Sequence, residues 1–386
     1  MKEKSENFIS FLKSMNENKD KFPLHEPFFY GNEKKYILET IDSTYISSFG
    51  TMINNLENKI SKYTKINFSI ACINGTSALH AALLIAGVKK GDEIITQSLS
   101  FVATSNAISY TGGVPVYVDV DIDTMGMSPT ALQDFLEEHC EIREEGTFNV
   151  KTRKKIGACV PMHTFGFMCR IDKIKKICKK WNIPLIEDAA EAFGSSYKGL
   201  SAGKYGMLSI FSFNGNKIIT SGGGGCIVTE KKSLFKKAKH ITSTAKISSN
   251  WEFNHDQVGY NYRMPNLNAA IALGQLEQIN QKIQYKKTLY EHYKENLPNM
   301  GIELVQIPEN TSWNYWLMAI KLSSKKERDK FLAFTNNKKV FTRPIWKLLY
   351  KLPMYRYAQR DSQKNSIFLE KTIVNIPSNI LLNEKN

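Results

Sequence analysis

The stretch Leu208-Ser-Ile-Phe-Ser-Phe-Asn-Gly-Asn-Lys-Ile-Ile-Thr-Ser-Gly-Gly-Gly-Gly225 joins an apolar run to a lysine and then to a run of glycines. The apolar run is typical of a buried strand. Upstream, Ile186-Glu-Asp-Ala-Ala-Glu191 places carboxylates directly after another apolar run. A lysine amine can condense with an aldehyde, and a carboxylate can hold a pyridine nitrogen protonated. We therefore predict a Schiff-base site for pyridoxal 5'-phosphate (PLP), with Lys217 and Asp188 as its catalytic residues.

The alternative for Lys217 is a surface lysine beside a flexible glycine turn. That alternative leaves unexplained why the lysine follows so apolar a strand. Ser212 lies five residues before it on the same turn, so its hydroxyl can reach a phosphate while the lysine reaches the aldehyde. The glycines give the backbone freedom to turn away from a ring.

Asn74-Gly75-Thr76-Ser77 joins a predicted strand to a predicted helix and is a candidate phosphate site. A helix N-terminus offers unpaired N–H groups and a partial positive charge. The hydroxyls of Thr76 and Ser77 can add hydrogen bonds, each worth roughly 1.5–3 kcal/mol net. The alternative is an ordinary helix N-cap, a role that Thr and Ser serve equally well.

Three further residues follow strands and are candidates with structural alternatives. Phe101 can stack on a pyridine ring, although a lone phenylalanine is more often part of a core. Glu191, like Asp188, needs a polar partner if it is buried. His163 is either a structural histidine or a site residue. The order of phosphate turn, aromatic residue, acid, serine and lysine favours one cofactor site over unrelated features.

Short apolar runs alternate with helical patterns from about residue 68 onward. We expect strands over 68–73, 93–96, 115–120, 156–160, 184–187, 208–212 and 226–229, and helices over 76–88 and 105–110. This alternation predicts an α/β fold with a mostly parallel sheet and helices on both faces. Ligands in such folds gather at the carboxyl ends of the strands, where the candidate residues fall.

The chain divides into three predicted parts. Residues 1–30 form an N-terminal arm that begins with an amphipathic helix, and residues 31–265 form a large PLP-binding domain. Residues 266–386 begin with one long connecting helix over 266–293 and continue into a smaller α+β domain. Its expected strands are 302–305, 315–322 and 339–341.

Composition indicates a soluble cytoplasmic protein. The 386 residues are 42% hydrophobic and 23% charged, and they include neither an apolar run of about 18 residues nor a signal-peptide pattern. The six cysteines form no Cys-x-x-Cys pair, so we expect reduced thiols and no metal site. The net charge is +15, but lysines such as those in Lys173–Lys180 are spaced like the solvated face of a helix. We therefore expect no nucleic-acid partner, whereas a basic surface suits an anionic small substrate.

At these residues the chain resembles the DegT/DnrJ-type sugar-nucleotide aminotransferases, a branch of the fold-type I (aspartate aminotransferase-like) PLP enzymes. The resemblance covers nearly the whole chain and rests on Asn74-Gly-Thr-Ser-Ala-Leu-His80, Gly91-Asp-Glu-Ile-Ile95, Ser100-Phe-Val-Ala-Thr-Ser-Asn-Ala107, Glu187-Asp-Ala-Ala190, Ser212-Phe-Asn-Gly-Asn-Lys217 and Gly259-Tyr-Asn-Tyr-Arg263. It implies that Lys217 is the Schiff-base lysine and proton shuttle, that Asp188 contacts the ring nitrogen and that Phe101 stacks on the ring.

The same resemblance implies phosphate contacts and a dimer. Thr76, Ser77 and Ser212 would bind the phosphate, and Asn261 would reach it from the partner subunit of a homodimer with active sites at the interface. Glu191 stands where many members have a glutamine that bonds the ring hydroxyl. The related 3-dehydrases carry a histidine in place of Lys217, so that activity is disfavoured.

A narrower resemblance concerns the substrate. Pro23-Leu-His-Glu-Pro-Phe-Phe-Tyr-Gly-Asn-Glu33, Asn314-Tyr-Trp-Leu317 and a stretch from Thr342 to Tyr355 are similar to the LegC-type subgroup. This implies amination of UDP-2-acetamido-2,6-dideoxy-4-hexulose at C4 with L-glutamate as amino donor, in bacillosamine- or legionaminic acid-type surface glycan synthesis. The candidate substrate contacts are His25, His163, Arg343, Trp346 and Lys347. Arginine pairs well with phosphate, although a surface role is about equally consistent with the sequence.

Two alternatives stay open at this point. The first is an aminotransferase of perosamine type that acts on GDP-4-keto-6-deoxymannose. The second is a non-catalytic protein on the same fold that binds nucleic acid or another partner, and the +15 charge is its only support.

Overall fold

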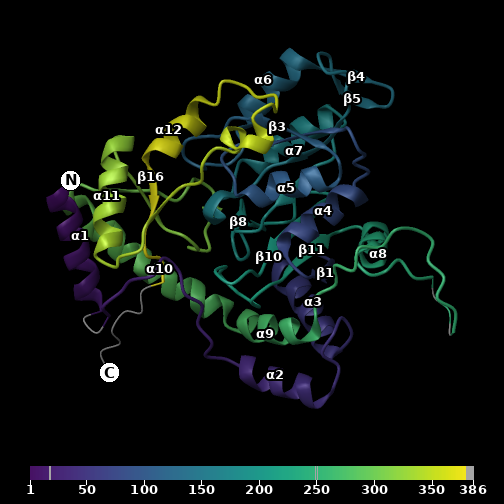
Figure 1. Ribbon diagram of the computed structural model, residues 1–386, viewed down its shortest axis with the longest axis horizontal. Helices are drawn as coiled ribbons and strands as arrows, with labels where there is room; N and C mark the ends of the chain where they lie inside the picture. Colours follow the sequence, from purple (N-terminus) through teal and green to yellow (C-terminus); the bar gives the residue numbers. More distant parts are fainter. Residues whose placement is uncertain (17–18, 248, 250, 380–386) are drawn as a thin grey trace.

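The computed structural model describes residues 1–16, 19–247, 249 and 251–379 (Figure 1). The helices of its central part are α2 (Glu33–Asp42), α3 (Thr51–Thr64), α4 (Gly75–Ile85), α5 (Val102–Tyr110), α6 (Pro129–His139), α7 (Ile171–Lys180), α8 (Lys232–Ile241) and α9 (Asn266–Glu277). The strands that they surround are β1 (Phe68–Cys72), β2 (Glu93–Gln97), β3 (Val114–Val118), β6 (Ile156–Val160), β7 (Ile186–Asp188), β10 (Leu208–Ser212) and β11 (Gly225–Thr229). Short hairpins β4 (Cys140–Arg143) with β5 (Gly146–Asn149) and β8 (Ser196–Tyr197) with β9 (Leu200–Ser201) lie between them in the chain.

The central strands lie side by side in the order β3-β2-β6-β7-β10-β11-β1. Bridges from Cys159 to Leu185 and from Met162 to Asp188 connect the β3-β2-β6 block to the β7-β10-β11-β1 block. Neighbouring strands are parallel except where β11 pairs with β10 and β1. The loop between β10 and β11 contains no crossover helix, so the chain returns antiparallel. The mostly parallel sheet is confirmed, and the reversed β11 was not expected.

Helices cover both faces of this sheet, as predicted. Successive strand residues point to opposite faces, and Ile70 and Ala71 of β1 accordingly lie in two different core clusters. Ile94 and Ile95 of β2 divide in the same way. One cluster includes residues of α4, α5 and α8, whereas the other includes residues of α3, α6, α7 and α9.

The C-terminal part carries a smaller antiparallel sheet in the order β12-β14-β16-β15. Its elements are α10 (Ile279–Asn296), β12 (Glu303–Leu304), β14 (Ala319–Lys321), α11 (Lys325–Asn337), β15 (Arg343–Pro344), α12 (Lys364–Thr372) and β16 (Ile373–Asn375), and β13 (Thr311–Ser312) pairs instead with β8. The N-terminal helix α1 (Lys2–Met15) packs against α11, where the Phe8 and Phe331 ring centroids are 5.5 Å apart (Figure 1). The arm then runs parallel to the chain that precedes β15, through an isolated bridge from Phe22 to Val340.

Three details differ from the sequence predictions. The long helix expected over 266–293 is interrupted at Gln278, which ends α9 and precedes α10. The strand expected over 315–322 is limited to Ala319–Lys321. Residues 339–341 form no regular strand, and the chain pairs with the small sheet at Arg343–Pro344 instead.

Two general expectations can be compared with the described residues. All six cysteines lie in this part of the chain as free, buried thiols. Within the same ranges, no helix is both long enough and apolar enough to cross a membrane.

Candidate active site

Most of the predicted site residues line one cavity of about 410 Å³ at the carboxyl ends of β7 and β10. The predicted residues along its wall are Gly75, Thr76, Phe101, Asp188, Glu191, Ser212, Lys217, Arg343 and Trp346. Lys217 also lines a second cavity of about 940 Å³, whose wall includes His25. The loop between β10 and β11 thus places this lysine where the two cavities approach each other.

The Lys217 amine is held between a carboxylate and an indole ring. Its Nζ lies 3.1 Å from Oε1 of Glu191 and 3.9 Å from the centroid of a ring of Trp316. The indole Nε1 of Trp316 donates a hydrogen bond of 2.6 Å to the carbonyl oxygen of Asn216, next to the lysine. Trp316 stands within Asn314-Tyr-Trp-Leu317, one of the stretches similar to the LegC-type subgroup, but its contact with Lys217 was not predicted.

Asp188 ends β7 and is 4% exposed. Its Oδ2 accepts a 2.7 Å hydrogen bond from Oγ1 of Thr104, and its Oδ1 accepts one of 3.2 Å from the backbone N–H of Ala190. Burial raises the pKa of this carboxyl, although these hydrogen bonds and the Lys217 charge oppose the shift. A buried carboxylate whose direct hydrogen-bond partners are neutral would gain from a cationic group opposite it.

Glu191 is the second buried acid, and it connects two segments. One oxygen pairs with Lys217, and the other accepts a 2.8 Å hydrogen bond from the backbone N–H of Phe165. Burial raises the pKa of Glu191, whereas Lys217 lowers it. A glutamate at this position therefore makes an ion pair that a glutamine could not make.

The candidate phosphate turn is built by a close contact between Gly75 and Ser212. A Cβ atom at Gly75 would lie 2.9 Å from Cβ of Ser212, so only glycine allows this approach. Asn74 is the N-cap of α4, and its side chain accepts a 2.7 Å hydrogen bond from the backbone N–H of Ser77. Thr76 does not cap the helix and lines the cavity. The cap role that the sequence left open for Thr76 and Ser77 belongs to Asn74.

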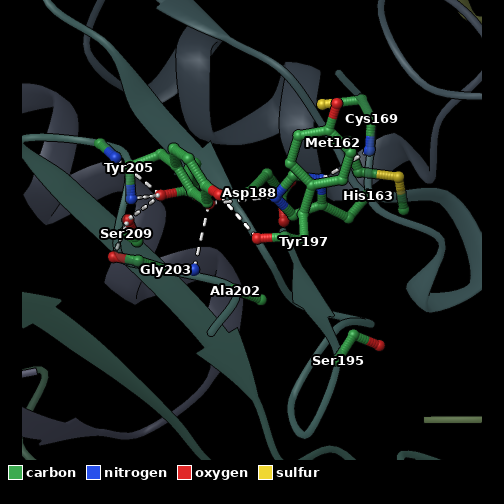
Figure 2. Close-up of polar contacts among 12 residues, drawn as sticks. Met162, His163, Cys169, Asp188, Ser195, Tyr197, Ala202, Gly203, Tyr205 and Ser209 are labelled. Carbon is green, nitrogen blue, oxygen red and sulfur yellow. Dashed lines mark hydrogen bonds and ion pairs between the residues drawn. The ribbon is translucent and has the colours of Figure 1, made fainter. Parts of the chain in front are cut away.

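The structure separates His163 from the cavity. The ring is fully buried, and its Nε2 lies 3.1 Å from Oε2 of Glu187 while Nδ1 accepts a 3.3 Å hydrogen bond from the backbone N–H of Cys169 (Figure 2). Glu187 also accepts hydrogen bonds from the backbone N–H groups of Gly203, Tyr205 and Gly206 and from the hydroxyl of Ser209. His163 therefore belongs to a buried polar network around Glu187. This position does not support the predicted contact between His163 and the substrate.

Three other candidates also lie outside the 410 Å³ cavity. Asn261 lines a separate cavity of about 440 Å³ together with Lys239, Lys246 and Arg263. Ser77 donates its backbone N–H to the Asn74 side chain, as described above, and Lys347 is exposed beside Trp346.

The residues around the 410 Å³ cavity fit PLP. The N-terminus of α4 offers N–H groups next to Ser212, Asp188 offers a buried carboxylate, and Lys217 offers an amine. These three groups match a phosphate, a pyridine nitrogen and an aldehyde, respectively. Phe101 lies along the same wall and is 50% exposed, so its ring is free to contact a bound molecule.

Comparison with known proteins agrees with this geometry. The sequence profile of the DegT/DnrJ/EryC1/StrS aminotransferase family matches residues 30–386. The chain belongs to this family. Within it, the chain is 37% identical to the GDP-perosamine synthase of Escherichia coli O157:H7 over 333 residues, which cover 86% of each protein. It is 32% identical to the GDP-perosamine synthase of Vibrio cholerae over 359 residues, which cover 92% of this chain and 93% of that protein.

A solved aminotransferase structure has the same fold. Helicobacter pylori PseC, an aminotransferase involved in the biosynthesis of pseudoaminic acid, superimposes with a TM-score of 0.85 at 22% identity and with 95% of each chain covered. The fold-type I architecture predicted from the sequence is therefore confirmed.

Proposed function

We propose that this family member is a PLP-dependent aminotransferase that converts GDP-4-keto-6-deoxymannose to the 4-amino sugar with L-glutamate as amino donor. The observation that carries the chemistry is the Lys217 amine, paired with Glu191 at 3.1 Å in the cavity that also contains Asp188. The two GDP-perosamine synthases, at 37% and 32% identity, support this sugar over the UDP-linked acetamido sugar that the LegC-type resemblance implied.

Bound PLP would supply an aldehyde for the lysine and a ring that accepts electrons from the bond being broken. The residues of this chain would hold it at three points. The N–H groups that open α4 and the Ser212 hydroxyl bind the phosphate. Asp188 keeps the ring nitrogen protonated, because a cation opposite this buried carboxylate offsets the burial that raises its pKa. Thr104 orients that carboxylate through its 2.7 Å hydrogen bond.

Lys217 then acts as the general acid and base. When its amine is released, Nζ takes a proton from one carbon and delivers it to another on the same face of the site. Glu191 keeps the amine beside the cavity at 3.1 Å, and the Trp316 ring limits its movement on the other side. Glutamate and keto sugar react in turn at this one position, as expected for a ping-pong reaction.

A homodimer completes this proposal. Asn261 lies away from Lys217 within one chain, in a cavity that also contains Lys246 and Arg263. We expect that cavity to face the partner's PLP phosphate. Trp251 and Phe253, which precede Asn261, are 82% and 78% exposed, so a contact with a second subunit would cover them.

The second candidate substrate is UDP-2-acetamido-2,6-dideoxy-4-hexulose. It is favoured by His25, which belongs to the LegC-like arm and lines the cavity next to Lys217. Offering the purified enzyme both keto sugars with L-glutamate, and measuring the amino sugar by mass spectrometry, distinguishes the two. Preferential amination of the UDP sugar would replace the perosamine-type assignment.

The PLP assignment is tested with Lys217→Ala, and the matched control is Lys232→Ala, at an exposed position at the start of α8. We expect Lys217→Ala to bind PLP without the visible absorbance of the lysine-linked form and to lose turnover. The control should remain yellow, bleach with L-glutamate and turn over normally. Near-normal amination by Lys217→Ala would reject the mechanism. A colourless wild-type protein that retards DNA would instead favour the non-catalytic alternative.

A further inference from the structure

The 940 Å³ cavity beside Lys217 contains basic groups that the proposed reaction has not used. Its wall includes His25 from the N-terminal arm and Lys282 and Lys286 from α10. Residues four apart on a helix share one face, so the two lysines point in the same direction. Lys217 closes the other side of this cavity, where it borders the candidate PLP site.

The amines of the two lysines contact neutral oxygens. Lys286 is 2% exposed, and its Nζ donates a hydrogen bond to the carbonyl oxygen of Ser378. Lys282 donates to the side-chain oxygen of Gln275 and, at 3.4 Å, to the carbonyl oxygen of Phe28. Over the ranges that the structure describes, neither lysine forms an ion pair.

Two carboxylates near this cavity, among the residues that the structure describes, make other contacts. Glu33 accepts a hydrogen bond from the Gln275 side chain and one of 2.8 Å from the backbone N–H of Gly31. It attracts the Lys282 amine electrostatically without forming an ion pair with it. Glu26, on the cavity wall, pairs with Lys19 at 3.6 Å. Nδ1 of His25 is buried and has no hydrogen-bond partner in the described part of the chain.

Buried amines without a counter-ion are costly, because the charged form loses its hydration. Burial lowers the pKa of Lys282 to about 8 and also lowers that of Lys286, and the mutual repulsion of the two amines contributes to the shift of Lys286. An anion in the cavity would provide negative charge and raise the pKa of both lysines, which favours their charged forms.

We propose that Lys282, Lys286 and His25 form an oxyanion subsite for a reactant whose other end lies at Lys217. The inference rests on the proposed function, because that reaction brings two oxyanions to the site. One is a carboxylate of L-glutamate, and the other is the diphosphate of the nucleotide sugar. A cavity of 940 Å³ lies within the range of about 300–1,000 Å³ that small-molecule sites occupy, and it can admit either.

The test uses the PLP-loaded enzyme and the variants Lys282→Met and Lys286→Met. Lys287→Met is the matched control, because Lys287 is an exposed neighbour on the same helix. Calorimetric titration with GDP and with UDP reports the nucleotide arm. The L-glutamate concentration that half-saturates bleaching of the cofactor absorbance reports the donor arm. Lys282→Arg, which keeps the charge, should restore binding if charge is what matters.

We expect one of the two constants to rise about 10–100-fold in both methionine variants, the usual effect of losing a charge-assisted hydrogen bond. A rise for L-glutamate alone assigns the subsite to the donor, and a rise for GDP or UDP alone assigns it to the nucleotide. Constants equal to those of wild type and Lys287→Met would overturn the proposal. If Lys286→Met does not fold, Lys282→Met and Lys282→Arg decide alone. Neither readout depends on which keto sugar is aminated, so failure of the oxyanion subsite can be told apart from a wrong sugar assignment.

Discussion

Replacing Gly75 with alanine tests whether the close approach of α4 to β10 creates the phosphate site. The new Cβ would lie 2.9 Å from Cβ of Ser212 and 3.3 Å from its Oγ. Carbon atoms pack at about 3.5–4.0 Å, so the helix N-terminus must move away from Ser212 by roughly 0.6–1.1 Å. Hydrogen bonds of about 2.9 Å from both sides to one phosphate would then exceed 3.5 Å on one side. Losing one or two charge-assisted bonds costs about 1.5–3 kcal/mol each, or at least a tenfold rise in the PLP dissociation constant.

The matched control is Gly223→Ala in the glycine run after Lys217. Its nearest neighbour would be the carbonyl oxygen of Ile73 at 3.6 Å, an ordinary contact, and its φ is not positive. PLP binding is measured by titrating the apo-protein and following absorbance, while urea unfolding of both variants reports stability. Overpacking at Gly75 should cost about 1–3 kcal/mol. If Gly75→Ala binds PLP as tightly as wild type and the control, the Gly75–Ser212 contact does not build the phosphate site.

Two further substitutions address the buried acids next to the sheet. Asp188→Asn should lower turnover by about 10²–10³-fold, because an amide cannot hold the ring nitrogen protonated. Burial raises the pKa of Asp188, so the wild-type apo-protein should lose stability as the pH rises from the ordinary carboxyl range through that raised pKa. Urea unfolding measured against pH should show that Asp188→Asn lacks this loss. Glu187→Gln should destabilise the protein by about 2–5 kcal/mol, because its NH₂ group would face the donors at Gly203 and His163. Burial raises the pKa of Glu187, but the hydrogen bonds from His163 and the backbone outweigh burial and lower this pKa. The stability of the wild type should therefore persist above about pH 4.3 and fall at lower pH. Glu187→Gln should lack this acid-dependent loss in thermal unfolding. An Asp188→Asn enzyme with normal turnover, or a Glu187→Gln protein as stable as wild type, would contradict the respective assignment.

The sequence predicted the central sheet well, because buried strands of a parallel sheet are continuous apolar runs. The observed strands Leu208–Ser212 and Ile156–Val160 have the same bounds as the predicted ones. It also predicted most of the cavity wall, because strand ends in such a sheet converge at one edge. His163 shows the limit of that rule, since it follows a strand but points into the polar network around Glu187. Which way a side chain leaves a strand end depends on neighbours that are distant in sequence.

The contacts of Trp316 and Lys286 were missed for a related reason. Trp316 stands in a motif of the narrower resemblance, but no local pattern shows that its ring packs against the Lys217 amine. Lys286 lies in Gln281-Lys-Ile-Gln-Tyr-Lys-Lys287, a pattern that indicates a solvated helix face, yet its side chain is 2% exposed. The N-terminal arm covers part of that face through His25, and local periodicity carries no information about such coverage.

The position of Lys217 between two cavities suggests how chemistry and selectivity are divided in this chain. The smaller cavity is built mainly on the central sheet, where Asp188, Ser212 and the start of α4 have fixed places. The larger cavity is lined mainly by the N-terminal arm and α10, which lie outside that sheet, together with Lys217 and Gln275 (Figure 1). If the oxyanion subsite binds the nucleotide, exchanging His25 in the arm should change the preference between GDP- and UDP-linked sugars while the L-glutamate half-reaction stays unchanged. If it binds the donor, the same exchange should change the half-reaction and leave the sugar preference as it is.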